Sequence, residues 1–174
     1  MPQPVTRGGR LALAVLLAAA LAVVAVRSAR AFDQGRHRAA AAATAAAPDV
    51  AVRRLAPVPG GAAGAAGDLR FRPGVWLSVV TLRQLQPVAG HERYLVFLRN
   101  WAGWTLAGAA RPDAAGAARL GFAAEPRPPT IFEVIVTRAV DNATSVPHGL
   151  PVLHWYDQSL APPRARPFDF ARGA

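Results

Sequence analysis

From residue 74 to residue 156, the chain alternates between short apolar runs and clusters of turn-forming residues. The runs are rich in valine, isoleucine, leucine and aromatic residues, which favour β-strands. They cover residues 74–80, 93–99, 104–110, 118–122, 131–138 and 152–156. Proline, glycine, asparagine and aspartate occupy the intervals, and no stretch after residue 68 carries a helical apolar stripe of useful length. The pattern predicts an all-β domain over residues 68–160, with the size and strand spacing of an immunoglobulin-like β-sandwich.

Two of the predicted strands indicate which side chains form the core. The strand over residues 131–138 has the most regular β-pattern of the chain. Alternate residues of a strand point to the same face of its sheet. We therefore expect one of two sets to pack against the facing sheet: Phe132, Val134 and Val136 of this strand, or Tyr94, Val96 and Leu98 of the strand over residues 93–99.

A different apolar pattern lies near the start of the sequence. Residues 11–26 are 16 consecutive apolar residues with no polar face. As a helix, the run would span about 24 Å, at a rise of about 1.5 Å per residue. Arg7 and Arg10 precede it, and Arg27 and Arg30 follow it. The run predicts a single-pass signal anchor in the cell membrane, with the flanking arginines reaching the lipid headgroups and the later domain outside the cytoplasm.

One alternative to this anchor remains open, and its orientation is open as well. The basic start, the apolar run and the small residues around Ala29-Arg30-Ala31 also fit a cleavable export signal, which would release a secreted domain. The arginines that follow the run, counted by the positive-inside tendency, favour the opposite orientation. That tendency applies best to short loops, whereas a long domain follows here.

Low-complexity segments separate the apolar run from the predicted domain. Residues 39–47 are alanine with one threonine, and residues 56–67 are alanine, proline, valine and glycine. Neither has an apolar face to bury, so residues 27–67 are predicted to be a flexible linker. Residues 1–10 form a short basic tail. Residues 161–174 are predicted to be a disordered tail, although Phe168 and Phe170 could dock on the domain.

Composition excludes several classes of function. The 174-residue chain has no cysteine, which excludes disulfides, thiol nucleophiles and cysteine-ligated metal centres. All 20 basic residues are arginine, and the formal net charge is +10. Most of that charge lies outside the predicted domain, because residues 68–160 hold nine arginines and seven acids, a net charge of +2. A nucleic-acid-binding surface across the domain is therefore not expected.

The order of several short motifs resembles the extracytoplasmic domain of anti-sigma-K factors. The matching segments are Tyr94-Leu95-Val96-Phe97, Leu106-Ala107-Gly108, Pro112-Asp113-Ala114-Ala115-Gly116, residues 132–137 and residues 147–153. In that family a Tyr-x-Leu-Trp-type strand, a strand ending near glycine, a Pro-Asp-x-x-Gly-like hairpin turn and a strand ending in Val-Thr follow one another. The resemblance covers about residues 75–155. Phe97 stands where the family usually has tryptophan, and Arg138 where glutamate commonly follows Val-Thr.

The resemblance implies a regulatory role outside the cytoplasm. Full-length members of the family place a cytoplasmic sigma-binding domain before the membrane helix, often with a zinc-ligand His/Cys pattern. In this sequence residues 1–10 precede the apolar run, and they are too few to wrap a sigma factor. What is implied is the sensor-side domain with its anchor, and direct sigma-factor binding by this chain is not expected.

Two sets of polar residues have the types found in reactive sites. Asp141, Ser145 and His148 match a hydrolytic triad, whereas His148, His154 and Asp157 could supply three metal ligands. The first set spans eight residues, all on one turn-rich segment that has no nucleophile elbow or oxyanion loop. No flanking pattern marks a metal site either. We interpret the first set as turn-forming polar residues, and we predict no catalytic, metal or cofactor site.

Two tryptophans and one loop are the candidates for contact with a partner. Trp101 and Trp104 flank an Ala-Gly pair and form either an exposed aromatic patch or, as we expect, a strand end that dips into the core. Residues 147–151 form a loop bounded by prolines. Asn142-Ala143-Thr144 fits a glycosylation sequon. A protein partner in or outside the membrane would contact such loops or the strand edges.

The sequence therefore predicts a membrane-anchored, extracytoplasmic β-sandwich protein that acts as a signalling accessory and not as an enzyme. The first alternative is a secreted binding domain released by signal-peptide cleavage. The second alternative is an enzyme of unrecognised type, which rests only on the scattered polar residues described above.

Overall fold

Antiparallel strands make up most of the chain that the structure describes. The computed structural model describes residues 42–43, 46–47, 50–71, 77–123, 131–140 and 144–170, all within one unit that spans residues 40–174. In these ranges the strands are β1 (Ala51–Pro57), β2 (Ala66–Phe71), β3 (Leu77–Arg83), β4 (Arg93–Asn100), β5 (Gly103–Ala110), β6 (Ala118–Ala123), β7 (Glu133–Ala139) and β8 (Leu150–Tyr156). The prediction of an all-β domain is confirmed.

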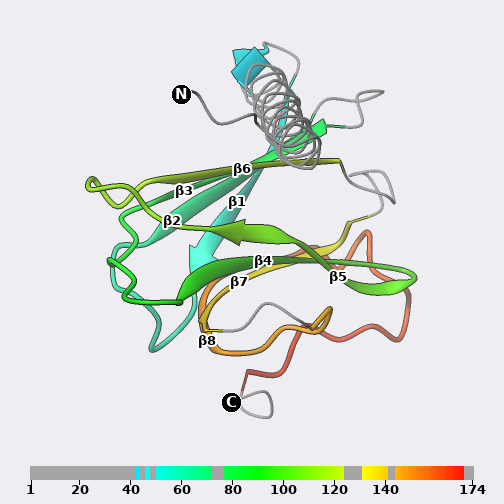
Figure 1. Ribbon diagram of the computed structural model, residues 1–174. Coiled ribbons are helices and arrows are strands. Elements are labelled where there is room, and N and C mark those ends of the chain that lie inside the picture. The colour runs from blue at the N-terminus through cyan, green and yellow to red at the C-terminus, as the bar shows by residue number, and fades with distance from the viewer. Residues whose placement is uncertain are drawn as a thin grey trace, which may run out of the picture. The chain divides into compact units, whose positions relative to one another are not determined.

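The strands form one sheet that rolls into a nearly closed barrel. Its order is β5-β4-β7-β8-β1-β2-β3-β6, and every neighbouring pair is antiparallel. Strand β1 joins the two halves, because residues 51–55 pair with β2 whereas Ala56 and Pro57 pair with β8. Figure 1 shows β1 descending from the layer of β2, β3 and β6 toward the layer of β4, β7 and β8. The end strands β5 and β6 contact each other where the Leu120 side chain of β6 packs against Gly108 of β5. A Cβ on Gly108 would lie 3.1 Å from that side chain.

The six strands predicted from the sequence are present as β3 to β8, with shifted ends. Residues 74–76 of the first predicted strand lie outside the described residues. Strands β1 and β2 differ from the expectation, because β1 and the first two residues of β2 lie inside the segment predicted to be a linker. The folded domain therefore begins before residue 68.

Long-range contacts explain why β1 and β2 lack an obvious strand pattern. In β1, the guanidinium of Arg53 lies over the rings of Phe71 and Trp155, at 5.8 and 5.9 Å from their centroids. In β2, Asp68 is buried and its carboxylate forms an ion pair with Arg83 on β3. Charged residues that look like linker or turn residues in the sequence are thus accommodated by partners distant along the chain.

The main core lies between the two halves of the sheet. Both predicted sets contribute to it: Tyr94, Val96 and Leu98 from β4, and Val134 and Val136 from β7. They pack in one cluster with residues of the opposite half such as Leu69, Val80 and Leu82. The expectation for the β4 set is confirmed. Phe132 precedes β7 and is also buried, but its ring packs edge-on against Tyr156, at 6.2 Å, outside that cluster.

The opposite side of the β4–β7–β8 layer is covered as well. We call this side, which carries Leu95, Phe97 and Ile135, the outer face. These three residues are 0% exposed, and Leu95 and Phe97 form a second apolar cluster with Ala139. Residues 157–170, which we call the C-terminal segment, lie against this face through contacts given below; in Figure 1 they are the orange-to-red part of the chain. The segment differs in this respect from the disordered tail predicted for residues 161–174, of which residues 171–174 lie outside the described residues.

Burial of Tyr94 predicts a loss of stability at alkaline pH. Its side chain is 1% exposed, and its hydroxyl donates a hydrogen bond to the carbonyl of Gln86, at 2.9 Å. Burial raises the pKa of Tyr94 above its ordinary value. A phenol whose pKa is raised by folding contributes stability that is fully present below the unfolded pKa of about 10 and is lost as pH rises through the folded pKa. We expect urea unfolding to show a stability that falls above about pH 10, and Tyr94→Phe to reduce this dependence. An equal dependence in the variant would contradict the assignment.

Candidate functional site

A fully buried carboxylate lies on the outer face. Glu133 is the first residue of β7, and its side chain is 0% exposed. Its Oε2 accepts a hydrogen bond from Nη1 of Arg99, and its Oε1 lies 2.9 Å from Nε2 of His154. The strand register brings these groups together: Arg99 of β4 is directly opposite Glu133, and His154 of β8 is opposite Ile135. Because a buried charge is tolerated only with partners, these pairs are required for the fold of this face.

The same groups bind the backbone of the C-terminal segment. The amide N–H of Phe168 donates to Oε1 of Glu133, at 2.6 Å. The Arg99 guanidinium, which already binds Glu133, also donates to the carbonyl of Arg166, at 2.9 Å. Glu133 and Arg99 therefore join two strands of the sheet to a segment more than 30 residues distant in sequence.

Two further side chains hold carbonyl groups of the segment. The hydroxyl of Tyr156 donates to the carbonyl of Ala165, at 3.1 Å. The indole Nε1 of Trp101 donates to the carbonyl of Leu160, at 2.9 Å. All four hydrogen bonds thus involve main-chain atoms of the segment, which are common to every peptide.

Aromatic rings supply the side-chain part of the contact. Phe168 packs edge-on against Trp104, with ring centroids 5.8 Å apart, and Phe170 packs against His154, at 5.1 Å. The two phenylalanine rings also touch each other, at 5.3 Å. The Arg99 guanidinium lies 5.3 Å from the ring centroid of Trp104. The expectation that Phe168 and Phe170 could dock on the domain is confirmed.

The three residues weighed as a hydrolytic set do not form a triad within the described residues. Asp141 lies outside the described residues, and Ser145 is exposed. Nδ1 of His148 lies 2.7 Å from Oγ1 of Thr144, and the His148 ring packs edge-on against Phe97. These contacts fit a residue that shapes the loop before β8.

Two of the three residues weighed as metal ligands, His154 and Asp157, contact other groups. His154 binds Glu133, whereas Oδ1 of Asp157 accepts hydrogen bonds from the backbone N–H and the hydroxyl of Ser159, at 3.0 and 2.6 Å. The hydrogen bond from the Ser159 hydroxyl holds the pKa of Asp157 below its ordinary value. Within the described ranges, no group of three His, Asp or Glu side chains is arranged to hold a metal ion.

The expectation that one or both tryptophans of this strand end dip into the core holds for Trp104 and not for Trp101. Trp104 packs against the second apolar cluster on the outer face, whereas Trp101 is 71% exposed. The β4–β5 turn explains this, because Oδ1 of Asn100 accepts hydrogen bonds from the backbone N–H groups of Ala102 and Gly103 and places Trp101 at the tip of a tight hairpin. Asn142 of the sequon lies outside the described residues.

Sequence reasoning missed Glu133 and Arg99 as functional residues. The signal that could have found them is the unbroken apolar run of Tyr94 to Leu98, which predicts a strand buried on both faces and hence a cover on each. A charged residue directly beside such a run needs a partner on the neighbouring strand.

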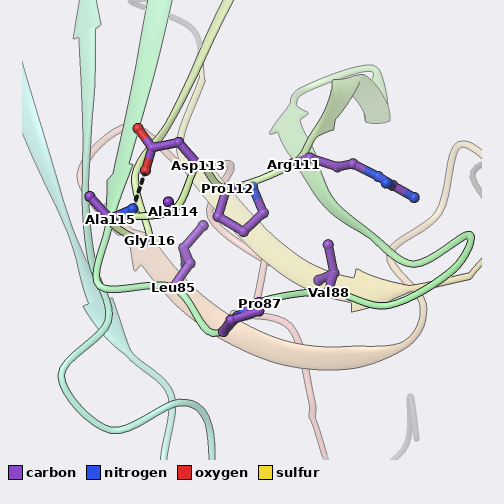
Figure 2. A pocket seen from close by; sticks show the side chains of 9 residues that line it. All are labelled: Leu85, Pro87, Val88, Arg111, Pro112, Asp113, Ala114, Ala115 and Gly116. Carbon is purple, nitrogen blue, oxygen red and sulfur yellow. Dashed lines mark hydrogen bonds between the residues drawn. The ribbon is translucent and has the colours of Figure 1, made fainter.

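A hollow of about 490 Å³ lies away from the outer face, between the loop after β3 and the loop that joins β5 to β6. Figure 2 shows Leu85, Pro87 and Val88 on one side of it and residues 111–116 on the other. Its polar side chains serve the loops themselves. Oδ1 of Asp113 accepts hydrogen bonds from the N–H groups of Ala115 and Ala117, at 2.9 and 2.8 Å (Figure 2 shows the first). The hollow therefore indicates loop packing and is the weaker candidate.

The loop with Asp113 does not connect two paired strands. In the family motif that residues 112–116 resemble, the corresponding turn joins the two strands of a hairpin. Strand β5 pairs with β4, and β6 pairs with β3, so the loop crosses between the two halves. It is anchored by the N–H of Leu85, which donates to the carbonyl of Gly116, at 2.9 Å.

Gly116→Ala is expected to destabilise the domain by about 2 kcal/mol or more. Gly116 has a φ of 72°, and a Cβ there would lie 2.7 Å from the carbonyl oxygen of Leu85. The left-handed backbone alone costs a non-glycine residue about 1–2 kcal/mol, and the clash adds to this. Gly90→Ala is the control, because Gly90 has a φ of 51° but nothing within 4 Å of its Cβ position. Equal shifts in thermal melting for the two variants would show that the Leu85 contact is unimportant.

In the part of the chain that the structure describes, no helix has the length and hydropathy needed to cross a membrane. The apolar run at residues 11–26 lies outside that part. Comparison with protein families, curated proteins and solved structures gives no match. The fold and the outer face define a β-domain whose own C-terminal segment lies on one face of the sheet.

Proposed function

We propose that this chain is a membrane-anchored protein whose β-domain lies outside the cytoplasm and acts by binding another protein. In this proposal it is a signalling accessory that resembles the sensor half of an anti-sigma-K factor, anchored by residues 11–26. The observation that carries the proposal is the main-chain recognition on the outer face. Four side chains of the sheet and its β4–β5 turn bind backbone atoms of a peptide segment.

The same observation disfavours an enzyme. Glu133 and His154 are an acid and an imidazole side by side on the outer face, and both are engaged with each other and with the C-terminal segment. A general acid or base needs access to substrate, whereas the carboxylate of Glu133 is fully buried. These groups are better suited to holding a segment than to proton transfer.

We further propose that the rolled sheet is a variant of the immunoglobulin-like sandwich. Support comes from the connections, since the chain crosses between the two halves after β3, β5 and β6. Strand β6 thereby pairs with β3, and β7 with β4. Such crossed pairing of antiparallel strands is typical of Greek-key sandwiches. In this interpretation β1 is an added strand that bridges both layers.

Fractionation of cells that express the full chain tests the anchor. We expect the protein to remain in the membrane fraction after an alkaline wash, and added protease to cleave the β-domain in cells whose outer layers have been permeabilised. Recovery from the medium, with a mature N-terminus near Ala31, would overturn the anchor in favour of the secreted alternative. Protection from protease in intact spheroplasts would overturn the orientation.

Site-specific crosslinking tests the contact with a protein. A photoreactive residue at Trp101, which is 71% exposed beside the C-terminal segment, should form one defined crosslinked product in membranes. A photoreactive residue at Arg119, exposed on β6 in the other half of the sheet, is the matched control. The same products from both positions would indicate collision rather than binding, and would argue against the proposal.

A further inference from the structure

We infer that the outer face is a binding site for peptides that carry two aromatic residues separated by one residue. The C-terminal segment, with Phe168-Asp169-Phe170, occupies this site within the chain, and a segment of the same pattern from a protein partner replaces it. The inference deepens the proposed function by naming the class of partner, and it rests on that function only for the existence of a protein partner.

The first argument is the way in which the segment is held. Residues 158–170 belong to no strand, so no β-ladder ties them to the sheet. The sheet binds them through the N–H of Phe168 and the carbonyls of Leu160, Ala165 and Arg166. Because each of these atoms belongs to the peptide backbone, a different chain can present the same donors and acceptors. Main-chain recognition combined with side-chain pockets is a general mode of peptide binding.

The second argument concerns specificity, which the two phenylalanines supply. Phe168 lies against Trp104 and Phe170 against His154, while both rings touch each other. Phe168 also carries the N–H that reaches Glu133, so one residue sets both the register and the aromatic contact. A ligand therefore needs an aromatic residue with a free N–H, followed two positions later by a second aromatic residue.

The third argument is that release of the segment calls for a replacement. Several groups that hold it are partly open to solvent: the side chain of Arg99 is 26% exposed and Trp101 is 71% exposed. Local release therefore costs less than global unfolding. The released face, however, would leave the Glu133 carboxylate without one of its donors and would uncover the edge of an apolar cluster. Binding of another peptide would restore the lost donor and cover the apolar cluster, so it is favoured over leaving the face exposed to water.

Because the chain's own segment competes for the site, the affinity for an added peptide should depend on how tightly that segment is held. A tethered segment competes at a high effective concentration, so a peptide in solution binds in proportion to the fraction of chains whose site is open. Weakening the tethered segment raises that fraction. We expect a labelled peptide of residues 160–170 to bind the full-chain variant F168A/F170A about tenfold more tightly, or better, than it binds the unaltered chain.

The experiment is fluorescence anisotropy with that peptide and with a control peptide in which both phenylalanines are alanine. Far-UV circular dichroism and a cooperative melt establish that each full-chain variant is folded at the temperature used. We expect the control peptide to bind at least about tenfold more weakly, since both aromatic contacts are lost. A folded F168A/F170A chain that does not bind the unaltered peptide, or that binds both peptides equally, would overturn the inference.

A second variant tests the main-chain contact separately from the aromatic contacts. Glu133→Gln in the F168A/F170A background removes the charge that accepts the N–H of Phe168 in the added peptide while conserving side-chain size, and should weaken peptide binding by about tenfold. Asp113→Asn in the same background, the corresponding change of a carboxylate to an amide on the β5–β6 loop, should have no effect. Equal binding by both variants would contradict the site. If the chain stays in membranes and forms the Trp101 crosslink but no peptide binds, this inference fails alone; if the peptide binds but the chain is secreted, only the membrane anchor fails.

Discussion

Replacing Glu133 by alanine should lower the free energy of unfolding by about 3 kcal/mol and release the C-terminal segment. The substitution removes the acceptor of three donors: the Arg99 guanidinium, the His154 ring and the Phe168 N–H. Loss of one partner from a buried ion pair costs about 3–5 kcal/mol, because the remaining charge is left uncompensated. We expect the lower end, since the side chains of Arg99 and His154 are 26% and 20% exposed and can recruit water.

Urea unfolding measures the stability of this variant, and limited trypsin digestion after Arg164, which is followed by alanine, measures release of the segment. The control is Glu92→Ala, the same change at a half-exposed carboxylate that lies 3.8 Å from Arg138. Exposed ion pairs contribute about 0–1 kcal/mol, so this variant should unfold almost as the parent does and keep its digestion rate. Equal losses in both variants would mean that the buried site does not anchor the segment.

Replacing Val134 by aspartate should prevent folding, or cost more than about 4 kcal/mol, a loss that is exceptional for a single substitution and that an unpaired buried charge can cause. Val134 is 0% exposed, lies in the middle of the main core and pairs with Leu98 of β4 and Trp155 of β8. A carboxyl group there has to be buried as an unpaired charge or to take up a proton, and both are unfavourable.

Val52→Asp in β1 is the matched control, because Val52 is also a strand residue but is 39% exposed. We expect its melting temperature to stay within a few degrees of the parent, as is usual for surface substitutions. The measurement is thermal unfolding followed by far-UV circular dichroism. If Val134→Asp melted like Val52→Asp, Val134 would be on the surface and the register of β7 would be shifted by one residue.

Local patterns in the sequence were sufficient to predict six of the strands and the sets of side chains that share a face. Each of β3 to β8 is a run of β-favouring residues between turn-forming ones. In β4, strict alternation places Tyr94, Val96 and Leu98 on one side, and the structure places all three in the main core. The period of two is a local property of an extended backbone, so no tertiary contact is needed to predict it.

The sequence was not sufficient for β1 and β2. Arg53 becomes a strand residue because it stacks with Phe71 and Trp155, and Asp68 because Arg83 pairs with it. The segment before residue 68 therefore resembled a linker, since its burial depends on residues that fold onto it from elsewhere in the chain.

Neighbouring residues are enough to predict a β-domain, the positions of six strands and the sets of β4 side chains that share a face. The contacts of the buried carboxylate follow only from the folded sheet, where Glu133 binds Arg99 and His154 and the segment with Phe168 and Phe170 lies over them. The difference lies in how far apart in the sequence the interacting residues are. Backbone extension and alternation follow from neighbouring residues, whereas the burial of a charge depends on which strands become neighbours and on what covers their outer face, and both are set by contacts between residues far apart in the chain.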